Sequence, residues 1–136
     1  MDCVFCRIVA GTLPSTKVYE DGSTLAIMDI NPLTPGHLLV LPKAHVENLF
    51  EADEELAATV IRVVVRIAKA VGRSLKPDGL NLLQANGKAA FQSVPHLHFH
   101  LIPRRSGDGK GFDWPLVPGK GEDIRRLGDL VRSVLA

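Results

Sequence analysis

The stretch Val94-Pro95-His96-Leu97-His98-Phe99-His100-Leu101-Ile102 carries most of the information in this chain, because it holds three of the five histidines at alternate positions. Successive side chains of a β-strand point to opposite faces. On a strand, this spacing therefore lines up the three imidazoles on one face and buries Leu97, Phe99 and Leu101 on the other. We expect a strand with a functional histidine face.

Two kinds of chemistry suit such a row of histidines. The imidazoles can hold a metal ion, or one of them can act as a nucleophile with its neighbours as helpers. A hydrolytic metal site usually also needs a carboxylate, yet no Asp or Glu lies between Asp78 and Asp108. Neutral polar residues (Asn86, Gln92, Ser93) and a small-residue loop precede the strand instead. Free backbone N–H groups there suit an anion, which favours a phosphate ligand.

Length and charge limit the other possibilities. A chain of 136 residues predicts a single domain, 1–136, with one site. The net charge of +1 predicts no nucleic-acid or membrane partner. The most apolar stretch, 60–67, is interrupted twice by arginine, and no signal peptide is visible, so we expect a cytoplasmic protein. Cys3 and Cys6 form a CxxC pair, which indicates metal binding or redox chemistry rather than a structural disulfide.

Local patterns predict an α+β fold. Short apolar runs indicate strands at 17–19, 24–29, 37–41 and 80–84, besides the histidine strand. Apolar residues recur at spacings of three and four from 52 to 75, which predicts one long amphipathic helix. Residues 106–121 are rich in glycine and proline and predict a coil, followed by a short helix at 122–135. Because there is no regular βαβ alternation, we expect an antiparallel sheet.

The segment 96–102 resembles the signature of the histidine triad (HIT) family of nucleotide-binding hydrolases and transferases. The resemblance covers about residues 2–115 and is closest to bacterial members of the Hint-like branch. It rests also on segments 3–11, 19–21, 29–32, 35–37, 42–45 and 92–94. It implies a HIT-like fold. The segment Phe112-Asp113-Trp114-Pro115 resembles a tail that in this branch lies near the partner subunit's site, which implies a homodimer.

The resemblance implies a role for each residue around the triad. His98 would attack the α-phosphate of a nucleotide derivative and form a nucleotidyl-histidine, which water then hydrolyses. His100 would donate to the phosphate oxygens, and Gln92, Ser93 and the backbone of Val94 would complete the phosphate cradle. Ser93 would also protonate or steady the leaving group. This is the chemistry of a nucleoside phosphoramidase.

The resemblance also implies a nucleoside pocket. Asp29 would accept hydrogen bonds from the ribose hydroxyls. His37, outside the triad, would pack near the nucleophile, with a buried structural histidine as the alternative. Ala85 stands where the family usually has Asn or Gln, so either Asn86 or Gln84 replaces that donor or the donor is missing. An apolar clamp would hold the purine base: Val4, Phe5, Ile8, Ile27 and Ile30.

Cys3, Cys6, His45 and His96 match a zinc site found in some bacterial members. Two thiolates and two imidazoles form a closed tetrahedral set, so we expect one structural zinc per chain and no organic cofactor. Phe91 stands at a position where glycine is common in the family, and we expect its side chain to narrow the leaving-group side of the substrate site.

Three functions remain open at this point. The first is a nucleotidyl hydrolase acting on a purine nucleoside phosphoramidate, an adenylyl conjugate or a dinucleoside polyphosphate. The second is a regulatory dimer that binds purine mononucleotides and hydrolyses weakly. The third is a zinc-dependent hydrolase that uses the triad as ligands.

Overall fold

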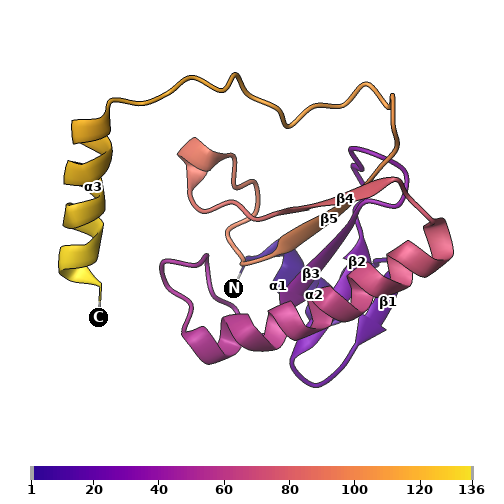
Figure 1. The fold of residues 1–136 in the computed structure, drawn as a ribbon. Helices are drawn as coiled ribbons and strands as arrows, with labels where there is room; N and C mark the ends of the chain where they lie inside the picture. Colours follow the sequence, from indigo (N-terminus) through magenta and orange to yellow (C-terminus); the bar gives the residue numbers. More distant parts are fainter. Residues whose placement is uncertain (1, 136) are drawn as a thin grey trace.

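A five-stranded antiparallel sheet with the order β1-β2-β3-β5-β4 forms the centre of the fold (Figure 1). The computed structural model describes residues 2–135. The strands are β1 (Lys17–Glu20), β2 (Thr24–Met28), β3 (Leu38–Pro42), β4 (Gly79–Leu83) and β5 (Phe99–Arg104). The helices are α1 (Val4–Val9), α2 (Glu54–Leu75), the 3-10 turn η1 (Lys88–Ala90) and α3 (Gly121–Val134). The expected α+β fold with an antiparallel sheet is confirmed.

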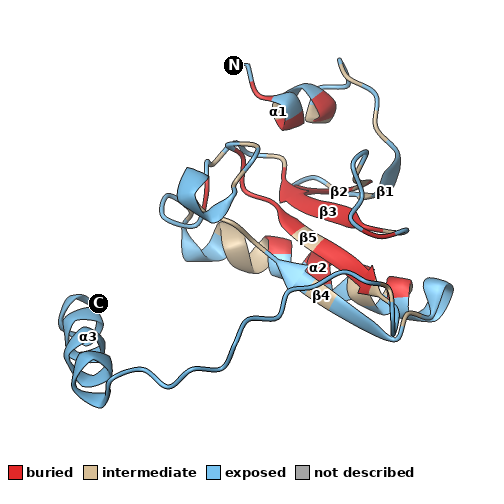
Figure 2. Ribbon diagram, turned by 90° about the horizontal axis from the view of Figure 1, so that it is seen from above, coloured by how far each residue is buried: buried red, intermediate tan, exposed pale blue. Residues whose placement is uncertain are grey.

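The central strand β3 is buried on both faces, because α2 covers one face and α1 the other (Figure 2). Side chains alternate between the two layers, as the two-residue period of a strand requires. Leu38 and Val40 pack with α2, whereas Leu39 and Leu41 pack with α1. The sheet therefore supports two separate apolar clusters, and the α1 side carries the site.

The long helix has the predicted place and clear ends. The Asp53 side chain accepts a hydrogen bond from the Leu56 N–H at 2.7 Å, which caps the first turn, so the helix begins at Glu54. Lys76 ends it in the left-handed conformation. The buried face of the helix consists of Val60, Val63, Val64, Ile67 and Val71.

The histidine strand is shorter than predicted. β5 begins at Phe99, so of the three histidines only His100 lies on it. Before that point the ladder to β3 is interrupted, because the His96 ring donates to the Pro42 carbonyl and the Leu97 N–H donates to Val46. The three imidazoles therefore do not form one row on a regular strand.

The sequence patterns missed two short elements, α1 and η1. Six and three residues, respectively, are too few to show a helical period. Beyond β5, the expected coil and C-terminal helix are present (Figure 1). Among residues 2–135, no helix combines the length and hydropathy that a membrane span requires.

The double-sided core predicts a sharp contrast between two valines. Val40 is fully buried in β3, whereas Val18 in β1 is 48 % exposed. We expect Val40→Ala to lower the free energy of unfolding by about 2 kcal/mol or more, since two methyl groups leave a packed core. Val18→Ala should cost less than half of that. Chemical denaturation measures both, and equal losses would contradict this packing.

Candidate functional site

A cavity of about 530 Å³ lies between α1 and the sheet. α1 supplies one wall, the end of β2 and the following turn supply another, and the segment that leads into β5 supplies the floor. The cavity is lined by Val4, Phe5, Ile8, Leu13, Pro14, Ser15, Ile27, Met28, Asp29, Ile30, Asn31, Leu39, Ser93, Val94, His98 and His100. A mostly apolar hollow with a few polar groups at one end is typical of a small-molecule site.

The proton on His98 can be placed from its surroundings. Its Nδ1 atom lies 2.6 Å from the backbone carbonyl oxygen of His96. A carbonyl only accepts, so Nδ1 carries a proton and donates it. Burial lowers the pKa of His98, which favours the neutral ring, and the remaining nitrogen Nε2 then has a free lone pair. The ring packs edge-on against Phe5, at 5.0 Å between centroids.

In His100 the proton lies on the other ring nitrogen, Nε2, and the neighbouring His37 shows why. The Leu33 N–H donates to Nδ1 of His37 at 2.9 Å, so the neutral His37 ring carries its proton on Nε2. That nitrogen lies 2.9 Å from Nδ1 of His100, which therefore accepts. The proton of the neutral His100 ring is then on Nε2. His98 and His100, with ring centroids 4.9 Å apart, thus provide a lone pair and a proton side by side.

Burial, together with the neighbouring His98 and His37, lowers the pKa of His100 to about 4. His100 is therefore a neutral donor near pH 7. Asp29 lies close by, with Oδ2 3.4 Å from Nε2 of His37 and 4.0 Å from Nδ1 of His100. These three side chains are grouped closely enough for a metal ion. However, the proton that Leu33 forces onto Nε2 of His37 occupies the lone pair that a metal would need.

Most residues of the expected site meet in this cavity. Ten line it directly: Val4, Phe5, Ile8, Ile27, Asp29, Ile30, Ser93, Val94, His98 and His100. His37 is buried just before β3, but it contacts His100 rather than the proposed nucleophile. Leu39 also lines the cavity, but the sequence patterns did not select it as a site residue. The pairing of the strands is the signal that could have found it. Leu39 lies opposite both Ile27 and His100 in the sheet.

Gln92 and Asn86 differ from expectation, since neither lines the cavity. The Gln92 amide donates to the carbonyls of Glu47 and Val94 and accepts from the Gly87 N–H, so it joins loops instead of facing a ligand. Asn86 and Gln84 bond to each other at 2.6 and 2.8 Å. Neither side chain lines the cavity, so neither replaces the donor that is absent at Ala85.

Phe91 also corrects an expectation. Its ring is 90 % exposed and is not part of the cavity lining, so it does not narrow the site. Its backbone has φ of 67°, in the left-handed region where glycine is the least strained residue. This backbone conformation explains why a glycine suits the position.

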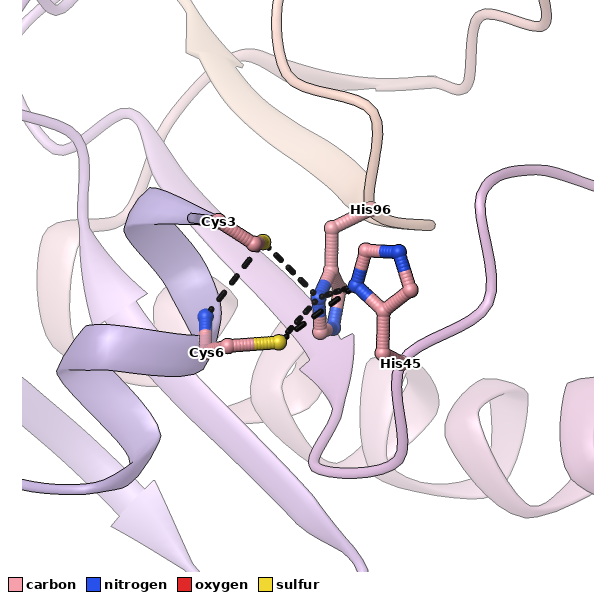
Figure 3. Close-up of side chains that lie close together, drawn as sticks. All are labelled: Cys3, Cys6, His45 and His96. Atoms are coloured by element: carbon pink, nitrogen blue, oxygen red, sulfur yellow. Dashed lines mark hydrogen bonds between the residues drawn. The ribbon is translucent and has the colours of Figure 1, made fainter. Parts of the chain in front are cut away.

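A second cluster, formed by Cys3, Cys6, His45 and His96, is shown in Figure 3. It adjoins Phe5, whose ring lies 5.8 Å from the His96 ring between centroids. The side-chain donors of Cys3, Cys6, His45 and His96 lie within 4.8 Å of one another. Nε2 of His96 donates to the Pro42 carbonyl at 2.7 Å, so Nδ1 has the lone pair, and it lies 3.4 Å from Sγ of Cys3. Sγ of Cys6 lies 3.4 Å from Nδ1 of His45. Two sulfurs and two imidazole nitrogens fit a closed tetrahedral zinc site.

The two sites share α1. Cys3 caps this helix, since its sulfur accepts from the Cys6 N–H at 3.4 Å. Phe5 lies between the two cysteines in the chain and contacts the rings of both His96 and His98. A ligand held by the cysteines would therefore position a wall of the cavity.

Comparison with known proteins agrees with this geometry. The HIT domain model matches residues 10–107. The adenosine 5'-monophosphoramidase of Schizosaccharomyces pombe is 40 % identical to this chain, with 98 % of each covered. Crystal structures of HIT family proteins from Bacillus subtilis and Bacillus anthracis are also similar. The B. subtilis structure has a TM-score of 0.93 at 44 % identity, with 100 % of this chain and 99 % of the other covered. The B. anthracis structure has a TM-score of 0.92 at 38 % identity, with 99 % of this chain and 98 % of the other covered.

A zinc-bound histidine triad family protein from Mycobacterium smegmatis has a TM-score of 0.78 at 42 % identity, with 98 % of both chains covered. These likenesses extend over nearly the whole chain, beyond the histidine motif itself. The chain therefore belongs to the histidine triad family.

Proposed function

We propose that this chain is a nucleotidyl hydrolase that cleaves a phosphorus–nitrogen or phosphoanhydride bond at the α-phosphate of a purine nucleotide derivative. The observation that carries the proposal is the hydrogen bond from Nδ1 of His98 to the His96 carbonyl, which leaves Nε2 free as a nucleophile. The S. pombe relative, an adenosine 5'-monophosphoramidase, supports the same class of substrate.

In the first step, Nε2 of His98 attacks the phosphorus and the bond to the leaving group breaks. The product is a nucleotidyl-histidine whose ring keeps its Nδ1 proton, and the His96 carbonyl stabilises the positive charge that forms on the ring. Ser93, which lines the cavity, protonates or steadies the leaving group. In the second step, water attacks the phosphorus, the Nε2–P bond breaks, and a nucleoside monophosphate leaves. The proton that the water releases replaces the one that the leaving group took up through Ser93 in the first step. One water is consumed overall.

His100 stabilises the charge on the phosphate oxygens by donating its Nε2 proton. This donor is in place before the reaction. The Leu33 N–H binds Nδ1 of His37, so His37 is protonated on Nε2 and donates to Nδ1 of His100, which leaves the His100 proton on Nε2. His37 is thus a positioning residue. The backbone of Val94 adds to the phosphate cradle, and Gln92 acts indirectly by fixing the loop that contains Ser93 and Val94.

The nucleoside occupies the apolar part of the cavity. The purine packs against Val4, Phe5, Ile8, Ile27 and Ile30, which contact its face and discriminate weakly between bases. Asp29 accepts from the ribose hydroxyls. Its Oδ1 already accepts from the Asn31 N–H at 2.8 Å, so Oδ2 is the freer acceptor.

Zinc is the metal that best fits Cys3, Cys6, His45 and His96. Its role would be structural, because four protein ligands leave no open position. It would tie α1, a helix of six residues, to the loop containing His45 and to the segment before β5. The zinc-bound M. smegmatis protein supports the choice of metal.

One observation favours a second function, a regulatory dimer that binds purine mononucleotides and hydrolyses them weakly. Ala85 carries no donor, and Gln84 and Asn86 are bonded to each other. A missing donor lowers transition-state stabilisation more than nucleotide binding. Steady-state kinetics on a panel of phosphoramidates and dinucleoside polyphosphates, with AMP and GMP binding by calorimetry, separates the two. Poor turnover with tight binding favours the regulatory role.

The covalent step predicts a strict dependence on His98. With adenosine 5'-phosphoramidate as the probe, acid quenching during turnover should reveal an adenylyl adduct on His98 by mass spectrometry. His98→Asn should lower kcat by about 1000-fold or more, because no other side chain supplies the nucleophile. AMP binding should be largely kept. Full turnover by this variant would rule out the covalent mechanism, whereas Ser93→Ala should keep the adduct and react more slowly.

The metal site predicts about one zinc per chain in protein purified without added metal. Cys3→Ser should lower the zinc content, and the melting temperature should fall with it, since zinc binding stabilises the folded state. Mass spectrometry of the native protein and thermal denaturation measure the two effects. Chelation that abolishes activity but leaves the melting temperature unchanged would instead favour a zinc-dependent hydrolase.

The lowered pKa of His100 predicts acid sensitivity. The unfolded chain binds a proton at this side chain below about pH 6.5, whereas the folded chain does not bind it until about pH 4. Stability is therefore full above pH 6.5 and falls as the pH drops from 6.5 to 4. Denaturation across this range should show the decline, and His100→Asn should reduce its slope by about one proton. An unchanged slope would contradict the shift.

A further inference from the structure

The carboxylate of Asp29 contacts the buried histidine pair as well as the cavity. Among residues 2–135, Asp29 is the single acidic residue that lines the cavity. Its Oδ2 atom lies 3.4 Å from Nε2 of His37 and 4.0 Å from Nδ1 of His100. The side chains of Asp29 and His37 are 15 % and 7 % exposed, so water screens their interaction only weakly. The group proposed to bind the ribose therefore also acts on the histidines.

The sheet holds Asp29 beside His37. Asp29 directly follows β2 and His37 directly precedes β3, and the two strands pair as far as Met28 and Leu38. The Asp29 N–H continues this pairing by donating to the His37 carbonyl at 3.1 Å. The Asn31 N–H donates to Oδ1 of Asp29 at 2.8 Å, which fixes the rotation of the carboxylate. Together these bonds keep Oδ2 close to the His37 ring.

The proton on Nε2 of His37 thus has two acceptors within reach. Nδ1 of His100 is the nearer one, at 2.9 Å, and it is neutral. Oδ2 of Asp29 is farther away, but a charged acceptor forms a hydrogen bond about twice as strong as a neutral one. Burial lowers the pKa of His37 and the Asp29 charge opposes this shift, as expected for an acceptor of this proton. The two acceptors therefore compete.

Ribose hydroxyls at Oδ2 would change the balance between these acceptors. Hydroxyls that donate to Oδ2 occupy its lone pairs and lower its charge density, so His37 donates more fully to His100. Hydrogen bonds in a chain strengthen one another. A stronger bond at Nδ1 of His100 therefore makes its Nε2–H a better donor to the phosphate oxygens.

We propose that Asp29 is a positioning residue through which the ribose hydroxyls activate His100, so that the sugar raises the rate of the chemical step as well as the affinity. The proposal rests on the proposed transfer of a nucleotidyl group to His98. A carboxylate that only anchored the ribose would bind ground state and transition state equally and would leave the rate of the bound complex unchanged. The substrate class is thereby narrowed to nucleotides with a free 2',3'-diol.

Single-turnover kinetics measures the effect of the diol on the chemical step. Adenosine 5'-phosphoramidate and its 2',3'-dideoxy analogue are compared with the enzyme in saturating excess, and formation of the His98 adduct is followed. Loss of the diol should lower this rate constant by about 10-fold, which is less than the cost of about 100-fold for removing a whole donor. Weaker binding with an unchanged rate constant would overturn the proposal.

The variant Asp29→Asn tests whether the diol acts through this side chain. Its amide oxygen can still accept from the Asn31 N–H, which turns the NH₂ group toward His37. An NH₂ group does not accept, so the His37 proton goes to His100 with either substrate. The ratio of the two rate constants should therefore fall from about 10 to about 1, whatever the overall rate of the variant. A ratio that stays near the wild-type value would overturn the proposal.

The matched control is Asp53→Asn. It makes the same chemical change at the cap of α2, which is not part of the cavity lining, and Asn caps a helix as well as Asp. The control should keep the wild-type ratio. Loss of the ratio in both variants would mean that the effect is not specific to Asp29 and would overturn the proposal.

Nuclear magnetic resonance tests the proposal in the unaltered protein and without turnover. In protein labelled with ¹⁵N-histidine, the scalar coupling between Nε2 of His37 and Nδ1 of His100 reports the strength of their hydrogen bond. Saturation with AMP should increase this coupling, whereas saturation with 2',3'-dideoxy-AMP should not. Absence of a His98 adduct with both substrates would instead contradict the proposed function, and the coupling would still decide whether the ribose controls the histidine pair. Equal couplings with the two nucleotides would overturn the proposal.

Discussion

The backbone and side chain of His96 join the two sites of this protein. Its ring donates to the Pro42 carbonyl and turns Nδ1 toward the cysteines, while its own carbonyl accepts from His98. Movement of the His96 backbone would therefore disturb both the proposed zinc ligands and the orientation of the proposed nucleophile. The ring is completely buried, so the surrounding core resists such movement.

α1 adds a second connection between the sites. It is too short to be stable alone, and it is held by the burial of Cys3, Phe5 and Ile8 against β2 and β3. A zinc ion bound by the two cysteines would fix the same helix that forms the apolar wall of the cavity. Metal binding and nucleotide binding would then favour the same ordered state of α1, and each would strengthen the other.

The sequence was sufficient for the sheet, the long helix and most of the cavity, because each has a local signature. Alternation marks the strands, a three-to-four spacing marks α2, and the histidine motif carries the family resemblance. It was insufficient for Gln92, whose amide donates to the Glu47 carbonyl, and for Asn86, whose side-chain oxygen accepts from the Leu49 N–H. A polar residue near a phosphate motif has the same sequence signature whether it faces the ligand or holds the loop. Only the partners of each amide separate the two roles.

The three histidines show how identical side chains acquire different chemistry. Nothing in the ring distinguishes the proposed metal ligand, nucleophile and donor, since a neutral imidazole always has one proton and one lone pair. The fixed backbone partners decide: the Pro42 carbonyl for His96, the His96 carbonyl for His98, and the Leu33 N–H, acting through His37, for His100. A backbone group cannot change from donor to acceptor. The fold therefore sets each tautomer before any ligand binds, so the proposed reaction would require no energy for reorienting these protons.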